Sequence, residues 1–146
     1  MNSFTDEISL TPVQGSNKLW RVNDEFAWHI GRKGSDYHVI VEAGFVYDLA
    51  SVPMIARPVV PHTTAPQASA LHDKGYRDNE IWIVKEWVDG EPIYLDEPHK
   101  MHREFWDVQF LQAMTALEVF PARAQAAYAG VRAGGWYSWK KHRKND

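Results

Sequence analysis

Residues 99–119, HKMHREFWDVQFLQAMTALEV, form the longest stretch with helical periodicity in the chain. One face of such a helix collects Trp106, Phe110, Ala113, Met114 and Leu117 at helical spacings. The amino-terminal end of this face is polar, because Arg103 and Asp107 lie on or beside it. The stretch therefore predicts a long helix that packs on a core and carries charged groups at one end.

The charged end of this helix allows two interpretations. Arg103 and Asp107 are four residues apart, so they can form an ion pair at the margin of the core. They can instead close one wall of a pocket, with His102 on the other flank of the apolar stripe. An unpaired buried charge is costly, so both interpretations expect these groups to meet partners.

Four short strands are expected before this helix, at 19–22, 25–30, 37–41 and 45–47. Residues 31–36 suit a hairpin loop between the second and third strands. In the third strand, polar and apolar residues alternate, which predicts one wet face carrying His38, Ile40 and Glu42.

A shorter helix is expected from about Ala65 to Lys74. A threonine at 63–64 can cap its start, and Gly75 is placed to end it. His72 and Asp73 then fall in the last turn, where a negative charge opposes the helix dipole. Asp73 is therefore expected to meet a positive partner, either Arg103 or a metal ion.

The remaining sequence completes a single α+β domain at 1–139, with a small antiparallel sheet packed by two or three helices. Asp89-Gly90 between two apolar runs predicts a hairpin, and Pro92 places its second strand at an edge. A last helix is expected at 121–133, followed by a basic tail at 140–146.

Composition limits the classes of function. The 146 residues include seven Trp and 45% hydrophobic residues, which is enough for an ordered core. The net charge of −3 argues against nucleic acid as a partner of the whole surface. There is no cysteine, so a thiolate metal site and a Cys nucleophile are excluded. The sequence predicts no signal peptide and no membrane span.

Asp48 and Ser51 flank a corner where a strand runs into a turn. Short polar side chains at such corners usually bond the local backbone. Alternatively, Ser51 can act as a nucleophile with His72 or His102 as its base. The usual glycine-flanked serine elbow is absent, so the turn interpretation is preferred for Ser51.

A second interpretation of the polar residues is a site for a divalent metal such as zinc. His72, Asp73 and Asp107 provide nitrogen and oxygen ligands of the required kind, and His102 is a further candidate. No strong metal-binding motif supports this set, so it depends on residue type alone.

Four segments resemble a known family. They are GFVYDLASVP at 44–53, ALHD at 70–73 with Tyr76 following, REFWD at 103–107, and YAGVR at 128–132. Their order and content are similar to those of a family of small phage and prophage proteins called DUF1353. The chain departs from the family pattern at Tyr47, Leu49 and Trp106, where Thr, Gly and Ala are expected.

The resemblance implies a phage setting and a shared polar site, without implying a reaction. The positions that match are Asp48, His72, Asp73, Arg103 and Asp107. The leading hypothesis is a metal-assisted hydrolase in the host cytoplasm or associated with the virion. Its His72, Asp73 and Asp107 serve as ligands or acid–base groups, Arg103 holds the substrate, and Asp48 orients His72.

The alternative hypothesis is a non-catalytic phage structural or assembly protein. In that case the same residues form a buried network that fixes the fold, and aromatic surfaces bind a phage or host protein.

Overall fold

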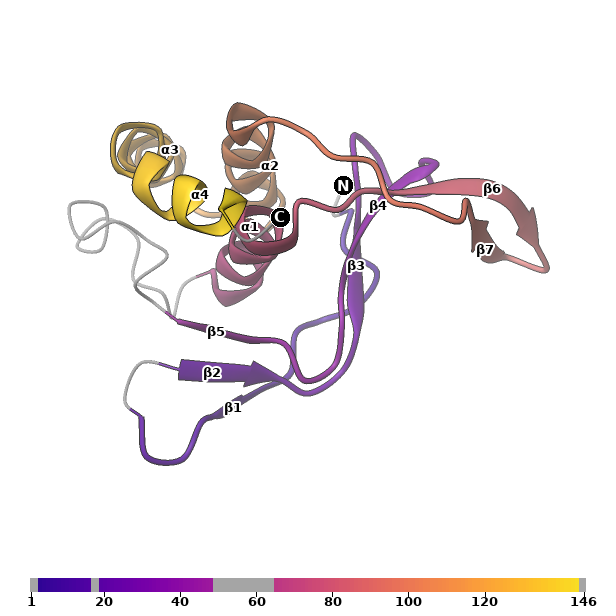
Figure 1. Cartoon of the computed structure of the whole chain (residues 1–146), viewed down its shortest axis with the longest axis horizontal. Coiled ribbons are helices and arrows are strands. Elements are labelled where there is room, and N and C mark those ends of the chain that lie inside the picture. Colours follow the sequence, from indigo (N-terminus) through magenta and orange to yellow (C-terminus); the bar gives the residue numbers. More distant parts are fainter. Residues whose placement is uncertain (1–2, 17–18, 49–64, 145–146) are drawn as a thin grey trace.

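The computed structural model describes residues 3–16, 19–48 and 65–144. Within these ranges the chain forms two antiparallel sheets and four helices, which confirms the predicted α+β domain. The helices lie together on one side of the molecule, and the strands form the other side (Figure 1).

The first sheet has the strand order β1-β2-β5. Its strands are β1 (Leu10–Pro12), β2 (Leu19–Val22) and β5 (Val46–Asp48). β2 agrees with its predicted range, and β5 lies one residue beyond its predicted position. β1 is not predicted by the sequence, because its three residues include a proline and carry almost no periodicity.

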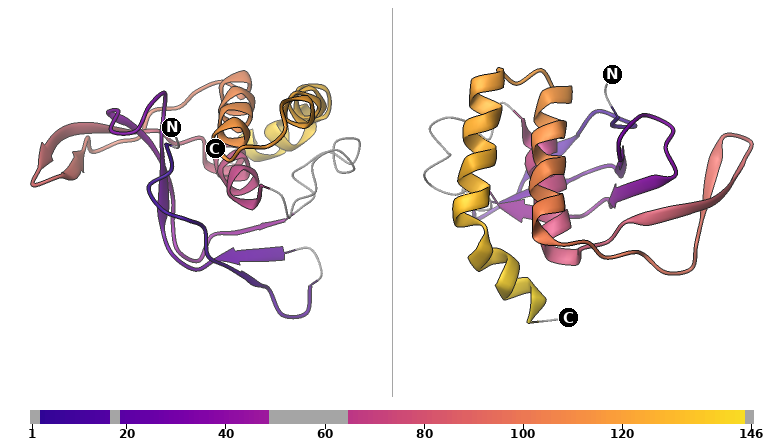
Figure 2. Two further views of the ribbon diagram at one scale, coloured as in Figure 1. Left: turned by 180° about the vertical axis from the view of Figure 1, so that it is seen from behind. Right: turned by 90° about the horizontal axis from the view of Figure 1, so that it is seen from above.

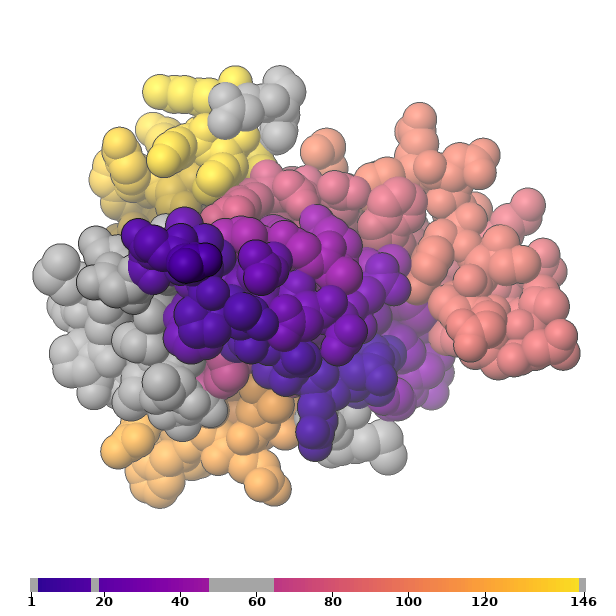
Figure 3. All heavy atoms as spheres, turned by 90° about the horizontal axis from the view of Figure 1, so that it is seen from below, coloured from indigo at the N-terminus to yellow at the C-terminus, as the bar shows by residue number. Residues whose placement is uncertain are grey.

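The second sheet has the strand order β3-β4-β6-β7. Its strands are β3 (Phe26–His29), β4 (Tyr37–Val41), β6 (Trp82–Val88) and β7 (Glu91–Tyr94). Asp89 and Gly90 have φ angles of 52° and 80°, as expected for the tight turn of a hairpin. β7 lies at the edge, so the predictions from Asp-Gly and Pro92 are confirmed. The hairpin projects away from the helices (Figure 3).

The two sheets are joined by a bent ribbon that runs from β2 into β3 and from β4 into β5. Val22 donates to the carbonyl of Phe45 at 2.9 Å, and Gly44 donates to the carbonyl of Val22 at 2.8 Å. Gly44 has a φ of 91°, which a residue with a Cβ adopts only at a cost. This glycine therefore lets the ribbon turn its corner and places β5 beside the helices.

Helix α1 (Pro66–Asp78) extends beyond Gly75, so the predicted end at Lys74 is wrong. Asn79 terminates it with a left-handed φ of 51°, and its backbone N–H donates to Gly75. His72 and Asp73 consequently lie in the body of the helix, and the argument from the helix dipole does not apply to Asp73. The predicted threonine caps lie outside the described residues.

Helix α2 (Arg103–Ala116) begins four residues later than predicted. His99 lies in an extended segment paired with Ile81, while His102 is the N-cap and accepts from Phe105 at 3.4 Å. His102 therefore has a local capping role. The helix ends through Glu118, whose φ is 62°, without the glycine that would signal this in the sequence.

Helix α2 packs closely on α1 through Gly75. A Cβ at this position would overlap the indole ring of Trp106. Trp106 is fully buried, and its indole N–H donates to the side chain of Asn79 at 2.7 Å. The largest fully buried apolar side chains around this contact include Phe26, Val41, Tyr47, Leu71, Phe110, Met114 and Val131. The core therefore lies between the helices and the bent ribbon (Figure 2).

Helices α3 (Pro121–Gly134) and α4 (Trp136–Arg143) complete the domain. α3 agrees with its predicted range within one residue. α4 is not predicted by the sequence, and it includes most of the segment expected to be a solvated basic tail. Arg143 donates to the carbonyls of Tyr76 and Arg77, both at 2.9 Å, and lies over Trp139. The end of the chain is thus attached to the end of α1.

Arg143→Ala should therefore destabilise the protein by about 1–2 kcal/mol, because it removes donors to two carbonyls at the end of α1. Lys141→Ala changes the same charge on the same helix but is exposed, so its effect should stay within about 0.5 kcal/mol. Urea unfolding of both variants checks this. Equal midpoints would show that α4 is not attached through Arg143.

Candidate functional site

The polar centre of the protein is the carboxylate of Asp107, in α2. Four side chains from three helices point at it: His72, Tyr76, Arg103 and Arg132. His72 and Tyr76 contact one oxygen, each at 2.7 Å. Arg132 and Arg103 contact the other, at 2.9 Å and 3.4 Å. His72 therefore lies beside Asp107, and the Arg103–Asp107 pair predicted from helical spacing is confirmed.

Asp107 is fully buried. Burial alone would raise its pKa, but the hydrogen bonds from His72, Tyr76 and Arg132 outweigh that effect and hold its pKa below 3.8. The group is therefore an anion at neutral pH. A buried anion of this kind needs all its donors, since removing any of them leaves charge uncompensated.

Tyr76 supports this anion as a neutral donor. Burial, followed by the hydrogen bond to Asp107, raises the pKa of Tyr76, so its hydroxyl keeps its proton. Its ring packs against the His72 ring, with centroids 4.2 Å apart, and against Trp139 of α4. A Cβ on Gly135 would overlap the Tyr76 hydroxyl, so the glycine between α3 and α4 makes room for this group.

The guanidinium of Arg103 donates its hydrogen bonds to groups inside the protein. Besides Asp107, its acceptors are the carbonyls of Val131 at 3.0 Å and Arg132 at 3.2 Å, near the end of α3. The hypothesis that Arg103 holds a substrate is therefore not favoured by the geometry. Arg103 instead links α2 to α3 across Asp107.

Asp73 faces a different direction from His72. It pairs with Arg77 of the same helix at 3.1 Å, so the predicted pairing with Arg103 is wrong. Arg77 also donates to the carbonyl of Val46 in β5 at 2.6 Å. Burial, followed by the charge of Asp73, raises the pKa of Tyr47 in β5. On α1, His72 therefore points toward α2, whereas Asp73 points toward the first sheet.

Two predicted site residues are not placed by their side chains. The backbone of Asp48 ends β5, two residues along the strand from Val46. Its side chain and all of Ser51 lie outside the described residues. The prediction that Asp48 orients His72 stays untested, and Asp107 already binds Nε2 of that ring.

The predicted metal set does not converge. Across residues 3–16, 19–48 and 65–144, no three His, Asp or Glu side chains come together as a metal site. Both oxygens of Asp107 already accept two donors each, and Nε2 of His72 is bonded to Asp107. Asp73, the third proposed ligand, lies outside this network and is paired with Arg77.

Tyr76 and Arg132 belong to the centre but are not among the site residues that the sequence predicts. Tyr76 follows His72 by four residues, so both lie on one helix face, and this spacing is the available signal. Arg132 is contributed by α3 and is the last residue of the YAGVR segment that resembles the family, but no periodicity links it to Asp107. Only the packing of α3 on α2 brings it there.

A second group of polar rings lies in the β3–β4 hairpin. His29 and His38 are cross-strand partners whose rings stack with centroids 3.8 Å apart. His38 is fully buried and bonds Tyr94 at 2.9 Å, so its predicted place on a wet face is wrong. Tyr94 and Trp87 from the β6–β7 hairpin cover this face of the sheet.

The fold and site define a small α+β protein whose three-helix layer is held around one buried carboxylate. The chain belongs to the DUF1353 family, described as a protein of unknown function, and the family model matches residues 20–131. That range begins within β2, includes most of α3 and ends one residue before Arg132. No curated protein and no solved structure matches the chain.

Proposed function

We propose that the protein is a small hydrolase in which His72 is the general base and Asp107 is the residue that positions it. The observation that carries this proposal is the 2.7 Å contact between Nε2 of His72 and the buried carboxylate of Asp107. A phage or prophage setting, with the protein in the host cytoplasm or on the virion, is part of the proposal and depends on the family resemblance.

The tautomer of His72 supports this role. The ionised carboxylate of Asp107 only accepts hydrogen bonds, so Nε2 of His72 must carry a hydrogen. In the neutral ring, Nδ1 then holds the lone pair and can accept a proton. Among the described residues, Nδ1 has no hydrogen-bonding partner that would compete for it. A buried acid that fixes an imidazole in this way is typical of general-base catalysis.

The chemistry proposed is hydrolysis of an ester or amide. Nδ1 of His72 takes a proton from water while the water oxygen bonds to the carbonyl carbon. The bond to the leaving group then breaks, and the leaving oxygen or nitrogen takes the proton back from His72. Asp107 remains ionised throughout and stabilises the imidazolium that forms between the two steps.

A divalent metal remains part of the proposal, with Asp73 as its protein ligand. A site with one carboxylate ligand completed by water suits calcium or magnesium better than zinc, which prefers nitrogen and sulfur donors. We expect metal analysis of the purified protein to find a divalent ion that Asp73→Asn loses. An Asp73→Asn variant with unchanged metal content would remove Asp73 from this role.

A non-catalytic structural or assembly protein is the second candidate. The saturation of Asp107 by donors from three helices favours it, since such a network also fixes a fold. Exposed aromatic side chains, including Trp87, Trp136 and Tyr137, favour it as well.

His72→Gln separates the two candidates. The glutamine amide can still donate to Asp107 near the position of Nε2, but it cannot act as a base. A hydrolase should lose at least about 100-fold in kcat on a responsive chromogenic ester, which is the usual contribution of a general base. The unfolding midpoint should change much less than in a variant that lacks the donor, such as His72→Ala.

His142→Gln is the matched control, because it replaces a histidine that lies outside the Asp107 network. It should keep full activity on the same substrate. If the wild-type protein is active and His72→Gln keeps that activity, His72 is not the base. No hydrolysis by the wild-type protein across ester, amide and phosphoester panels, with calcium or magnesium present, would favour the structural candidate.

A further inference from the structure

Helix α4 carries an outer face that neither the core nor the Asp107 network uses. The exposed residues of this face are Trp136, Tyr137, Lys140, Lys141 and Lys144. At about 100° per residue, these five positions fall within an arc of about 140° around the helix. We call this arc the α4 outer face. Trp139 and Arg143, which contact α1, lie just beyond the edge of this arc at Trp136.

The α4 outer face is cationic although the whole chain has a net charge of −3. The segment 136–144, WYSWKKHRK, has no acidic residue. Within the described residues, no carboxylate forms an ion pair with Lys140, Lys141 or Lys144. Burial, followed by the charges of Arg77, Arg143 and Lys141, lowers the pKa of His142, in accord with a positive local potential.

Aromatic and cationic groups share this surface. Trp136 is 52% exposed and Tyr137 is 68% exposed, which is unusual for large rings that have a core available nearby. The ammonium of Lys140 lies 5.7 Å from the centre of the Trp136 ring. Exposed Trp and Tyr beside lysines is the composition of helices that lie in the interface between membrane and water.

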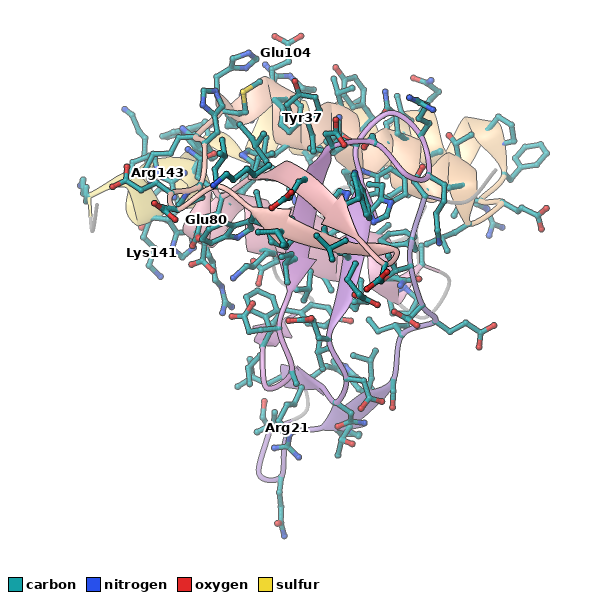
Figure 4. All side chains as sticks on the ribbon, turned by 90° about the vertical axis from the view of Figure 1, so that its right-hand side faces the viewer. Arg21, Tyr37, Glu80, Glu104, Lys141 and Arg143 are labelled. Carbon is teal, nitrogen blue, oxygen red and sulfur yellow. The ribbon has the colours of Figure 1, made fainter. Side chains whose placement is uncertain are left out.

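We propose that the α4 outer face docks on a membrane surface that contains anionic lipids. The two rings would enter the headgroup region, and the three lysines would contact lipid phosphates. The helix lies at one end of the molecule, where Lys141 reaches outward (Figure 4). This docking is peripheral: across the described ranges, no helix is long and apolar enough to cross a membrane. It does not depend on the proposed reaction.

The shape of the α4 outer face favours a lipid surface over a single-stranded nucleic acid. Proteins that hold single strands use a basic groove that follows the backbone, with aromatic rings along it. Here α4 is one short helix that continues from the end of α3 (Figure 2). Its rings and lysines are exposed on a single convex face. A convex helix matches a flat surface, because all of its outward side chains can reach that surface together.

Vesicle sedimentation with the full chain tests the proposal. Wild-type protein should bind vesicles of phosphatidylcholine mixed with phosphatidylglycerol, and should bind pure phosphatidylcholine much more weakly. Lys140→Gln with Lys141→Gln should weaken binding to the anionic vesicles by about 30-fold, since each lysine contributes about fivefold near such a surface. Trp136→Ala with Tyr137→Ala should also weaken it.

Matched controls use exposed residues away from α4. Lys85→Gln with Lys100→Gln makes the same change in net charge, and Phe120→Ala removes an aromatic ring that is 67% exposed. These variants should bind like the wild type. Absence of binding to anionic vesicles, or equal losses in the control variants, would overturn the proposal. So would α4-dependent binding to an oligothymidine strand without binding to vesicles.

Discussion

Asp107→Asn should cause the largest loss of stability among single polar substitutions in this protein, about 3 kcal/mol in the free energy of unfolding. The asparagine keeps the shape of the side chain but removes the charge that two arginines share. Arg103 would then remain positive at an 18% exposed position, held to α3 by carbonyls alone. Arg132 is one-third exposed and can regain water, which is why the low end of the usual range is expected.

Chemical denaturation of Asp107→Asn and of Asp96→Asn measures this effect. Asp96 is exposed, so its substitution makes the same chemical change without disturbing a network, and should shift stability by less than about 0.5 kcal/mol. Similar midpoints for the two variants would mean that the arginines find other partners. The proposed role of Asp107 as the residue that holds the helices together would then be wrong.

The dependence of stability on pH should show the same network. Because the folded-state pKa of Asp107 lies below its unfolded value of 3.8, its contribution is complete above that pH. The contribution is lost as pH falls through the lower folded-state pKa. Burial, followed by the charges of His38 and Lys33, lowers the pKa of His29 from 6.5 to about 4. Stability should therefore also decrease as pH falls from 6.5 toward 4, because the unfolded state binds this proton first. Asp107→Asn should reduce the pH dependence of the unfolding free energy only in the more acidic range, below pH 3.8.

The sequence predicted the parts of this protein whose signals are local. The Asp89-Gly90 hairpin and the start of α3 at Pro121 depend on backbone preferences of single residues, which neighbouring structure rarely overrides. The Arg103–Asp107 pair needed only helical spacing. The apolar stripe of α2 likewise follows from periodicity, and Trp106, Phe110 and Met114 are all buried as expected.

The sequence could not predict the parts that depend on packing between distant segments. Gly75 looks like a helix terminator, but it is retained inside α1 because Trp106 fills the space of its missing side chain. α4 looks like a charged tail until Arg143 and Trp139 meet the end of α1. Arg132 joins the candidate site from α3, and its spacing in the sequence does not link it to Asp107. In each case the deciding partner is at least 25 residues away, where periodicity gives no information.

Gly75→Ala should destabilise the protein by about 2–3 kcal/mol, opposite in sign to the usual effect of this change in a helix. Alanine normally gains up to about 1 kcal/mol over glycine in a helix interior. Here the added methyl would overlap the indole of Trp106, a fully buried ring bonded to Asn79 at 2.7 Å. Either α1 and α2 must separate or the ring must move, and both disturb the contact between His72 and Asp107.

A double-mutant cycle with Trp106→Leu isolates this contact. Leucine removes the indole atoms that the added methyl would meet, so Gly75→Ala should cost far less in the Trp106→Leu background than in the wild type. Equal costs in the two backgrounds would show that backbone conformation, and not the indole, demands glycine here. Because α1 and α2 carry His72 and Asp107, the same variant should also lower any hydrolytic activity. That loss should be partly restored when Trp106→Leu lets the two helices return to their wild-type separation, which ties the close packing at Gly75 to the geometry of the candidate site.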